Sequence, residues 1–130
     1  VEQAASATGI VRVAARILAA ETTPSTLRDL DTITAKDVLD AAKAGDELAL
    51  ASINKSMRYL GCAMANVTMI VDPQAYIIGG GVSKAGTFLT EIIQKYHDVM
   101  SPMSTKKAKV VLAELGNDAG IYGAARLLLN

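Results

Sequence analysis

The chain has 130 residues, of which 51% are hydrophobic, so it is long and apolar enough to bury the core of a single domain over residues 1–130. Thirteen basic and thirteen acidic residues cancel, which argues against a nucleic-acid partner or a polybasic membrane surface. The single cysteine, Cys62, excludes an internal disulfide and favours a reducing cytoplasm. The sequence has no uninterrupted apolar run of 18 residues, so no membrane span is predicted.

The first predicted element is an amphipathic helix over residues 3–20, because its apolar residues recur at helical spacing. Val1 and Glu2 precede it without an initiator methionine, so we expect the chain to be a segment of a longer protein. Residues 21–32 contain a proline and many hydroxyl and acidic side chains, which predict a loop.

Two capping signals predict the next helices. Thr34 stands three residues before Asp37, in the spacing of a capping box, and this predicts a short helix that ends at about Lys43. Gly45 follows as a stop signal, and Asp46 is suited to cap the helix after it.

The longest predicted helix spans residues 46–71. Its apolar residues alternate spacings of three and four and form a seam of about six turns. The seam consists of Leu50, Ile53, Met57, Leu60, Met64, Val67 and Val71. Small side chains around Gly61 allow another backbone to approach closely, either within the domain or across a dimer. Cys62 and the methionines of this helix are expected in the core. Asp72-Pro73 ends the helix.

The stretch AYIIGGGVSKAG, residues 75–86, joins a short apolar strand to three consecutive glycines. Ordering a glycine costs conformational entropy, so three in a row need a reason. A strand, a glycine turn and a helix, here from about 86 to 100, present free backbone N–H groups to which phosphates bind well. The dinucleotide fingerprint fails because Lys84 stands at its third glycine position, and the chain has no P-loop sequence. The turn is therefore either a ligand contact or a purely steric strand-to-helix connection.

The segment 107–115 predicts a second strand, because its central residues are continuously apolar and β-favouring. Helices alternating with short apolar strands predict an α/β fold in which helices predominate. His97 has no cysteine or second histidine near it, so a surface or partly buried polar residue is expected rather than a metal ligand. Neither spacing nor composition identifies a catalytic residue.

A last helix is predicted from about 119 to 129. Asn117 or Asp118 is suited to cap it. Gly120 and Gly123 are costly inside a helix, so they predict close packing against another element.

Four stretches together resemble the ROK family of sugar kinases. They are VEQAASATGIVRVA, ITAKDVLDAAKAGD, LGCAMANVTMIVDPQAYIIGGGVSKAG and LGNDAGIYGAA, in the order and at the spacing of the family. The chain is most similar to the C-terminal part of the glucokinases of Gram-positive bacteria. The resemblance implies an actin-like ATPase (ribonuclease H-like) fold, of which residues 1–130 would form most of the C-terminal lobe, the N-terminal lobe being absent.

The resemblance implies that the parent protein is a cytoplasmic kinase that transfers the γ-phosphoryl group of ATP, with Mg²⁺, to the 6-hydroxyl of glucose. Val1-Glu2 matches the end of the family's G-C-L-E motif, with Val1 where leucine is usual, so Glu2 is the candidate sugar contact. The family's turn against the nucleotide matches five consecutive residues, Gly79, Gly80, Gly81, Val82 and Ser83. Ser83 could alternatively cap the next helix.

The family's phosphate loop, catalytic aspartate and zinc ligands have no counterpart in this sequence, so the isolated chain is expected to be inactive and the zinc to belong to the parent protein. A homodimer through the helix over 46–71 or a nearby surface is also expected. The alternatives are a sugar-responsive ROK-family transcriptional repressor, which a preceding helix-turn-helix region would indicate, and a kinase for fructose, mannose or N-acetylmannosamine.

Overall fold

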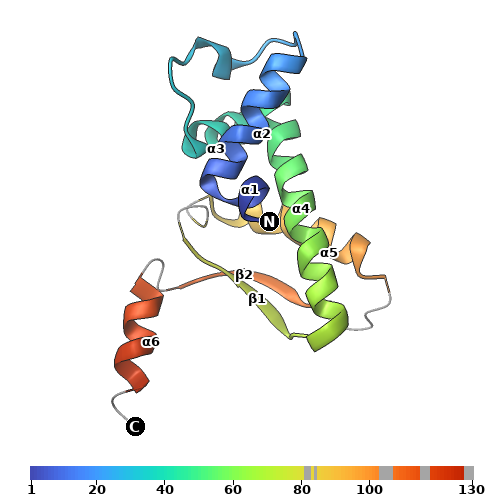
Figure 1. Cartoon of the computed structure of the whole chain (residues 1–130), viewed down its shortest axis with the longest axis vertical. Helices are drawn as coiled ribbons and strands as arrows, with labels where there is room; N and C mark the ends of the chain where they lie inside the picture. The colour runs from blue at the N-terminus through green and yellow to red at the C-terminus, as the bar shows by residue number, and fades with distance from the viewer. Residues whose placement is uncertain (81–82, 84, 103–106, 115–117, 128–130) are drawn as a thin grey trace.

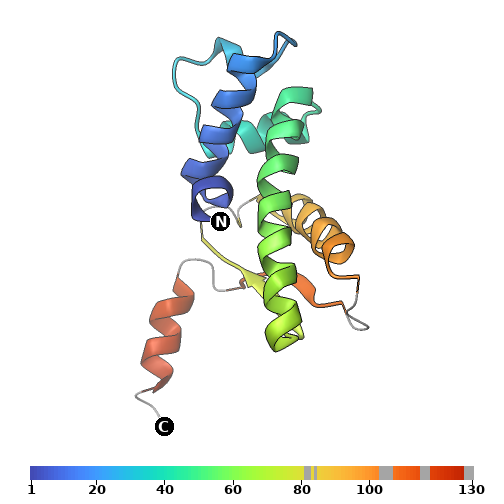
Figure 2. The ribbon, with the colours of Figure 1, turned by 45° about the vertical axis from the view of Figure 1, so that its right-hand side comes forward.

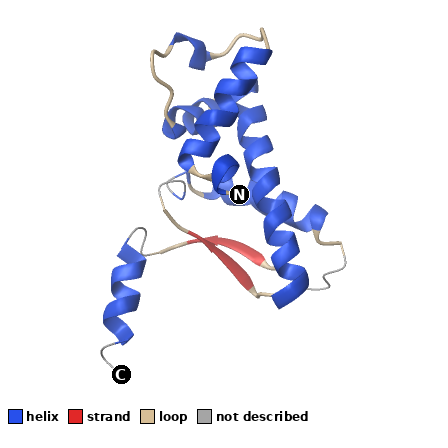
Figure 3. Cartoon of the chain, in the orientation of Figure 1, coloured by secondary structure: helices blue, strands red, loops and turns tan. Residues whose placement is uncertain are grey.

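A computed structural model of the protein describes residues 1–80, 83, 85–102, 107–114 and 118–127. A bundle of helices dominates it, and a small parallel sheet lies at one end of the bundle (Figures 1 and 3). The helices are α1 (Glu2–Ala5), α2 (Ala7–Ala20), the 3₁₀ helix η1 (Thr26–Asp29), α3 (Ala35–Lys43), α4 (Glu47–Val71), α5 (Thr87–Met100) and α6 (Ala119–Leu127). The strands are β1 (Ala75–Ile78) and β2 (Lys109–Leu112). The predicted α/β class with predominating helices is confirmed.

The predicted first helix is two helices, α1 and α2, because the chain turns at Ser6. The backbone of Ser6 is extended, and its hydroxyl accepts a hydrogen bond from the N–H of Gly9 at 3.1 Å, which caps α2. The turn brings α1 against the first turn of α2. A Cβ at Gly9 would lie 2.7 Å from the carbonyl carbon of Ala4, so only glycine permits this contact.

Both predicted capping signals are confirmed. Thr34 and Asp37 form a reciprocal capping box at the start of α3. Asp46 caps α4 and also accepts hydrogen bonds from Ser25 and Thr26 at distances down to 2.8 Å. The predicted loop therefore contains the short helix η1 and is attached to the start of α4.

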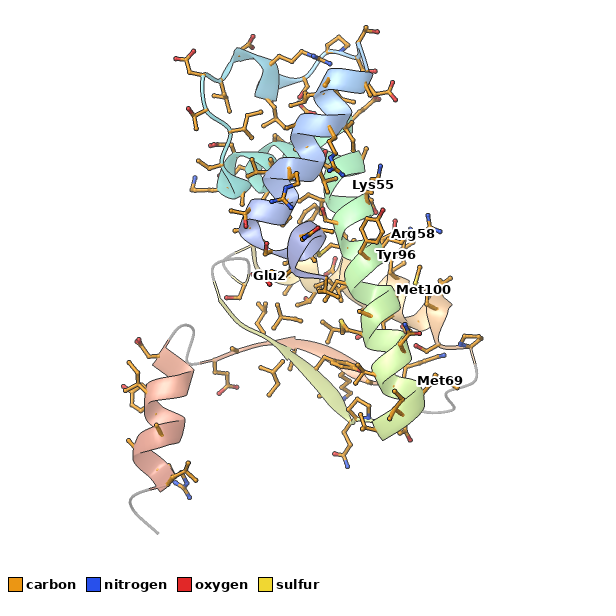
Figure 4. All side chains as sticks on the ribbon, in the orientation of Figure 1. Glu2, Lys55, Arg58, Met69, Tyr96 and Met100 are labelled. Carbon is orange, nitrogen blue, oxygen red and sulfur yellow. The ribbon has the colours of Figure 1, made fainter. Side chains whose placement is uncertain are left out.

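The close approach predicted at Gly61 is confirmed, and the neighbour is α5 of the same chain. A Cβ at Gly61 would lie 2.6 Å from the Cβ of Tyr96 and 3.0 Å from the backbone nitrogen of His97. Figure 4 shows Tyr96 beside the middle of α4. Gly61 thus serves packing between two helices of the same chain.

The seam of α4 is buried over only part of its length. The part up to Met64 lies in or against the core, whereas Val67 and Val71 are exposed. The other helices contribute Ile10, Leu27, Val38, Leu89 and Ile93 to this core. The prediction that Cys62 is a core residue is wrong: it is exposed, because one residue beyond Gly61 lies about 100° around the helix from the α5 contact. Met57 and Met64 are buried as predicted, whereas Met69 is exposed. None of the helices in the described ranges is long and apolar enough to cross a membrane.

The two strands pair in parallel, with Ala75 opposite Lys109 and Ile78 opposite Leu112. One face of the sheet packs on the core through residues such as Tyr76. The other face carries Ile77, which is 71% exposed. The second strand is shorter than the predicted 107–115 but lies within it.

Helix α6 stands apart from the bundle in both ribbon views (Figures 1 and 2). A Cβ at Gly120 or Gly123 would meet no atom within 4 Å, so the close packing predicted for them is wrong as far as the described residues go. The predicted cap residue Asn117 lies outside the described residues.

Candidate functional site

The carboxyl ends of β1 and β2 meet at one edge of the sheet, because the strands are parallel. Ligands of open α/β sheets bind outside this edge. The N–H of Ala113, just after β2, donates to the carbonyl of Ile78 at 2.9 Å, so pairing continues to the end of β1. Gly79 follows directly, and the segment after it leads to the start of α5. The glycine turn therefore begins at the edge where a ligand is expected.

The backbone conformation at position 80 requires a glycine. Its φ angle of +81° lies in the left-handed region, which side chains disfavour. The hydroxyl and the N–H of Ser83 both donate to its carbonyl oxygen, at 2.6 and 3.1 Å, and close the turn. No atom of the described residues lies within 4 Å of where a Cβ of Gly80 would be.

Gly79 has neither of the usual reasons to be glycine. Its φ angle is not positive. A Cβ there would lie 3.7 Å from the Cβ of Ala113, which is an ordinary van der Waals contact. Nothing among the described residues therefore prevents a side chain at Gly79, and the ligand contact predicted for this position stays a prediction.

The alternative role of Ser83 as a helix cap is wrong. Gly86 is the N-cap of α5, and no side chain caps that end. The Ser83 hydroxyl instead bonds within the turn, to Gly80. Gly81 and Val82, also predicted to contact the nucleotide, lie outside the described residues, as does Lys84.

Glu2 lies in the first turn of α1 and is exposed. Its carboxylate forms no hydrogen bond or ion pair with another described residue, which leaves it available to a ligand. Both ribbon views place the N-terminus near the end of β1 (Figures 1 and 2), and Figure 4 shows Glu2 at the start of α1. The structure thus brings the candidate sugar contact and the start of the glycine turn to the same side of the molecule, although they are almost 80 residues apart.

His97 is wholly buried, which the sequence reasoning missed. It lies four residues after Ile93 and eight after Leu89, on the buried stripe of α5, and this spacing was the available signal. No group of three His, Cys, Asp or Glu side chains in the described part of the chain could hold a metal ion.

Comparison with known proteins gives the same family over the whole chain. The model of the ROK family matches residues 1–130. A glucokinase of Halalkalibacterium halodurans is 40% identical over 131 residues, which cover 98% of this chain and 40% of that protein. The chain spans less than half the length of the curated relatives it matches.

Two solved structures are similar to the chain. A ROK family glucokinase from Streptomyces griseus, in complex with glucose and AMPPNP, has a TM-score of 0.85 and 32% identity, covering 97% of this chain and 43% of its own. A ROK family transcriptional regulator, a homologue of the E. coli MLC protein, has a TM-score of 0.70 and 34% identity, covering 85% of this chain and 28% of its own. The fold is that of the ROK sugar kinases, the actin-like ATPase fold.

Proposed function

The chain belongs to the ROK family, and on that premise we propose that it is most of the C-terminal lobe of an ATP-dependent glucokinase. Such an enzyme transfers the γ-phosphoryl group of ATP to the 6-hydroxyl of glucose. The 40% identity to a glucokinase and the likeness to a glucokinase that binds glucose and AMPPNP support this reaction. The observation that carries the proposal is Gly79, at the edge of the sheet where ligands bind, a position at which no described residue requires a glycine.

The exposed face of the sheet supports the proposal that the lobe is part of a larger body. Parallel sheets are normally covered on both faces. Here Ile77 and its partner Val111 lie side by side on the outer face and are 71% and 39% exposed. Further structure packed on this face would remove that apolar surface from water.

In this enzyme Glu2 accepts hydrogen bonds from sugar hydroxyls. A carboxylate can accept several such bonds and orient the sugar without reacting with it. The contact of α1 with α2 through Gly9 determines where this carboxylate lies. Glu2 therefore acts in sugar binding, and no residue of this chain is assigned as the catalytic base.

The main chain at Gly79 and Gly80 packs against the ribose and α-phosphate part of the nucleotide. The absence of a Cβ lets the ligand approach the backbone, and the start of α5 adds the favourable field of a helix N-terminus. This lobe contributes positioning, which is a large part of catalysis in phosphoryl transfer. The isolated chain is accordingly inactive and holds only part of each binding site.

The described residues do not fit a metal centre of their own. No cluster of three suitable side chains is found among them, and the one cysteine and the one histidine lie on different helices, the first exposed and the second buried. Mg²⁺ bound with ATP and a structural zinc thus stay predictions for other parts of the parent protein, and no step is derived through either metal.

The proposal is tested by a coupled assay of the complete kinase with ATP and glucose, alongside fructose, mannose and N-acetylmannosamine. We expect phosphorylation of glucose with the highest kcat/KM. Activity on another of these hexoses alone would replace glucose as the substrate, and no activity on any of them would contradict the kinase function.

The substitution Glu2→Gln tests the sugar contact. It keeps the size of the side chain but weakens hydrogen bonds from sugar hydroxyls, so the KM for glucose should rise about tenfold while the KM for ATP stays unchanged. Glu21→Gln, at an exposed carboxylate at the far end of α2, is the matched control and should leave both KM values unchanged. An unchanged glucose KM in the Glu2 variant would remove Glu2 from the sugar site.

A sugar-responsive transcriptional regulator is the second candidate, because a regulator of the family is 34% identical to the chain. The two functions differ in the complete protein. A regulator would bind DNA through a helix-turn-helix region and would not consume ATP in the assay above.

We further propose that the protein is a homodimer in the cytoplasm. The last turns of α4 expose Met69 and Ile70, at 60% and 82%, and a second copy is the occupant we assign to this surface. The exposed free thiol of Cys62 fits a reducing compartment. Sedimentation of the complete protein should give a dimer, and Ile70→Glu should give a monomer. A wild-type monomer would contradict the assignment.

A further inference from the structure

A buried polar cluster joins α4, β1 and α5. His97 is completely buried and Thr68 nearly so. Nε2 of His97 lies 2.8 Å from the hydroxyl of Thr68, which in turn lies 2.9 Å from the hydroxyl of Tyr76. The Tyr76 hydroxyl donates to the carbonyl of Met64 at 2.7 Å. These contacts attach β1, three residues before Gly79, to both helices that cover it.

The same cluster continues to β2. Nδ1 of His97 lies 3.1 Å from the carboxylate of Asp98, which accepts a hydrogen bond from the side-chain amide of Gln94 at 2.9 Å. Gln94 also donates to the carbonyl of Ala108 at 3.0 Å and accepts from the N–H of Val110 at 2.8 Å. A continuous path of polar contacts therefore runs from α4 through β1 and α5 to β2.

The chemistry of the groups assigns the protons along this path. A carboxylate only accepts, so the proton of a neutral His97 ring lies on Nδ1, toward Asp98. Nε2 then holds a lone pair and accepts the single hydroxyl proton of Thr68, which is therefore not donated to the carbonyl of Met64 at 3.0 Å. The Thr68 oxygen can then only accept from Tyr76, whose one hydroxyl proton is shared between that oxygen at 2.9 Å and the carbonyl of Met64 at 2.7 Å. Each polar side chain in the path therefore has a partner, including the two buried ones, Thr68 and His97.

We propose that this network, made of Thr68, Tyr76, Gln94, His97 and Asp98, positions the nucleotide turn. The inference rests on the proposed function. Helix α5 begins beside the turn and carries Gln94 and His97 in its second half. Gln94 bonds directly to β2, whereas β1 bonds to α4 through Tyr76, and His97 joins α4 to α5 through Thr68, so the network fixes both strands relative to the two helices. The positions of the strands along the helices then determine where their carboxyl ends lie and where the turn after β1 begins.

Apolar packing alone would not fix the position of the strands along the helices as closely. An apolar cluster of equal volume holds a strand against a helix but tolerates small shifts along it, whereas a satisfied polar network specifies one arrangement. The residues are positioning residues, because the network lies on the inner face of the sheet and packs on the core. Their loss should therefore weaken nucleotide binding and leave the sugar contact at Glu2 unaffected.

The test measures AMPPNP affinity by calorimetry, and the KM values for ATP and glucose, in the complete kinase and in Tyr76→Phe, Thr68→Val and Thr68→Ser. We expect the first two variants to lose AMPPNP affinity about three- to tenfold, with an unchanged KM for glucose. Thr68→Ser keeps the hydroxyl and should behave as the wild type. Tyr76→Phe removes only one partly buried oxygen, so we expect this variant to fold. It can therefore be measured even if Thr68→Val does not fold.

The outcomes separate this inference from the function it rests on. Variants with a lowered melting temperature but wild-type AMPPNP affinity would overturn the positioning role and leave a purely structural one. A wild type that binds AMPPNP without phosphorylating any hexose would refute the kinase proposal, while the affinities still decide the role of the network. A wild type that does not bind AMPPNP would refute both.

Discussion

Gly61 and Gly79 lack a side chain for different reasons. At Gly61 the backbone of α5 fills the space that a Cβ would need. At Gly79 the described residues leave room for a Cβ, and the backbone is not in a glycine-specific conformation. The sequence presents both positions only as glycines, so the packing role of Gly61 comes from the structure, whereas the ligand role of Gly79 is a proposal.

Substitution of Gly61 tests the packing role. Gly61→Ala places a methyl group 3.0 Å from the backbone nitrogen of His97, so α5 must move away from α4. We expect the free energy of unfolding to fall by about 1–3 kcal/mol in chemical denaturation. Gly123→Ala, in a helix with open space around the glycine, is the control and should be neutral or stabilising by up to about 1 kcal/mol. Equal effects of the two substitutions would show that α4 and α5 do not meet closely at Gly61.

The burial of Cys62 and His97 could not be predicted from the sequence. The sequence predicts a buried cysteine and a surface or partly buried histidine, but Cys62 is exposed and His97 is completely buried. Which side of a helix is covered depends on the angle at which its neighbour packs, and that angle comes from residues far away in the sequence. The helical period on α5 contained the information for His97, but only once the buried stripe of α5 is known.

Among the elements, the helix starts that carry local signals were predictable. The capping box of α3 and the Asp46 cap of α4 use side chains within three residues of the backbone groups that they satisfy. The break between α1 and α2 was missed because the apolar period continues across Ser6, and the turn depends on the close contact at Gly9. The strands were located because each is a short apolar run, although their lengths depend on pairing.

The Asp46 cap has a consequence for stability against pH. Burial acts to raise the pKa of Asp46, but hydrogen bonds from the N–H groups of Ala49 and Thr26 and from the hydroxyls of Ser25 and Thr26 hold that pKa below its usual 3.8. A carboxylate whose pKa is lowered by folding stabilises the protein above its unfolded pKa, and this contribution is lost as the pH falls through the lower folded value. The loss therefore begins below a pH of about 4.

The comparison of the chain with Asp46→Asn tests this linkage. Asparagine keeps the cap but not the charge, so the variant should be about 1 kcal/mol less stable at pH 7. The difference should shrink toward zero as the pH falls to about 2, measured by urea denaturation across that range. Asp31→Asn, at an exposed carboxylate without a partner among the described residues, should show no such difference. If the difference in free energy of unfolding between the unmodified chain and Asp46→Asn did not change with pH, the account would be contradicted.

In the whole molecule, the candidate site depends on contacts that no local pattern contains. The glycine turn could be recognised as a motif, and Glu2 as a match to a family motif. That the two lie on one side of the lobe follows from the packing of α1 on α2 and of α5 on α4, through Gly9 and Gly61. The sequence thus predicts the residues of the candidate site, and the fold supplies their arrangement.

The account depends most on the claim that a nucleotide packs against the bare main chain at the edge of the sheet. Gly79→Ala tests it directly, because the added methyl group meets only an ordinary contact with Ala113 and needs no unusual backbone angle. In the complete kinase we expect an unchanged melting temperature and glucose KM, with AMPPNP affinity reduced by about tenfold or more, which corresponds to ~1.4 kcal/mol. A stable Gly79→Ala variant that binds AMPPNP as tightly as the wild type would contradict the account.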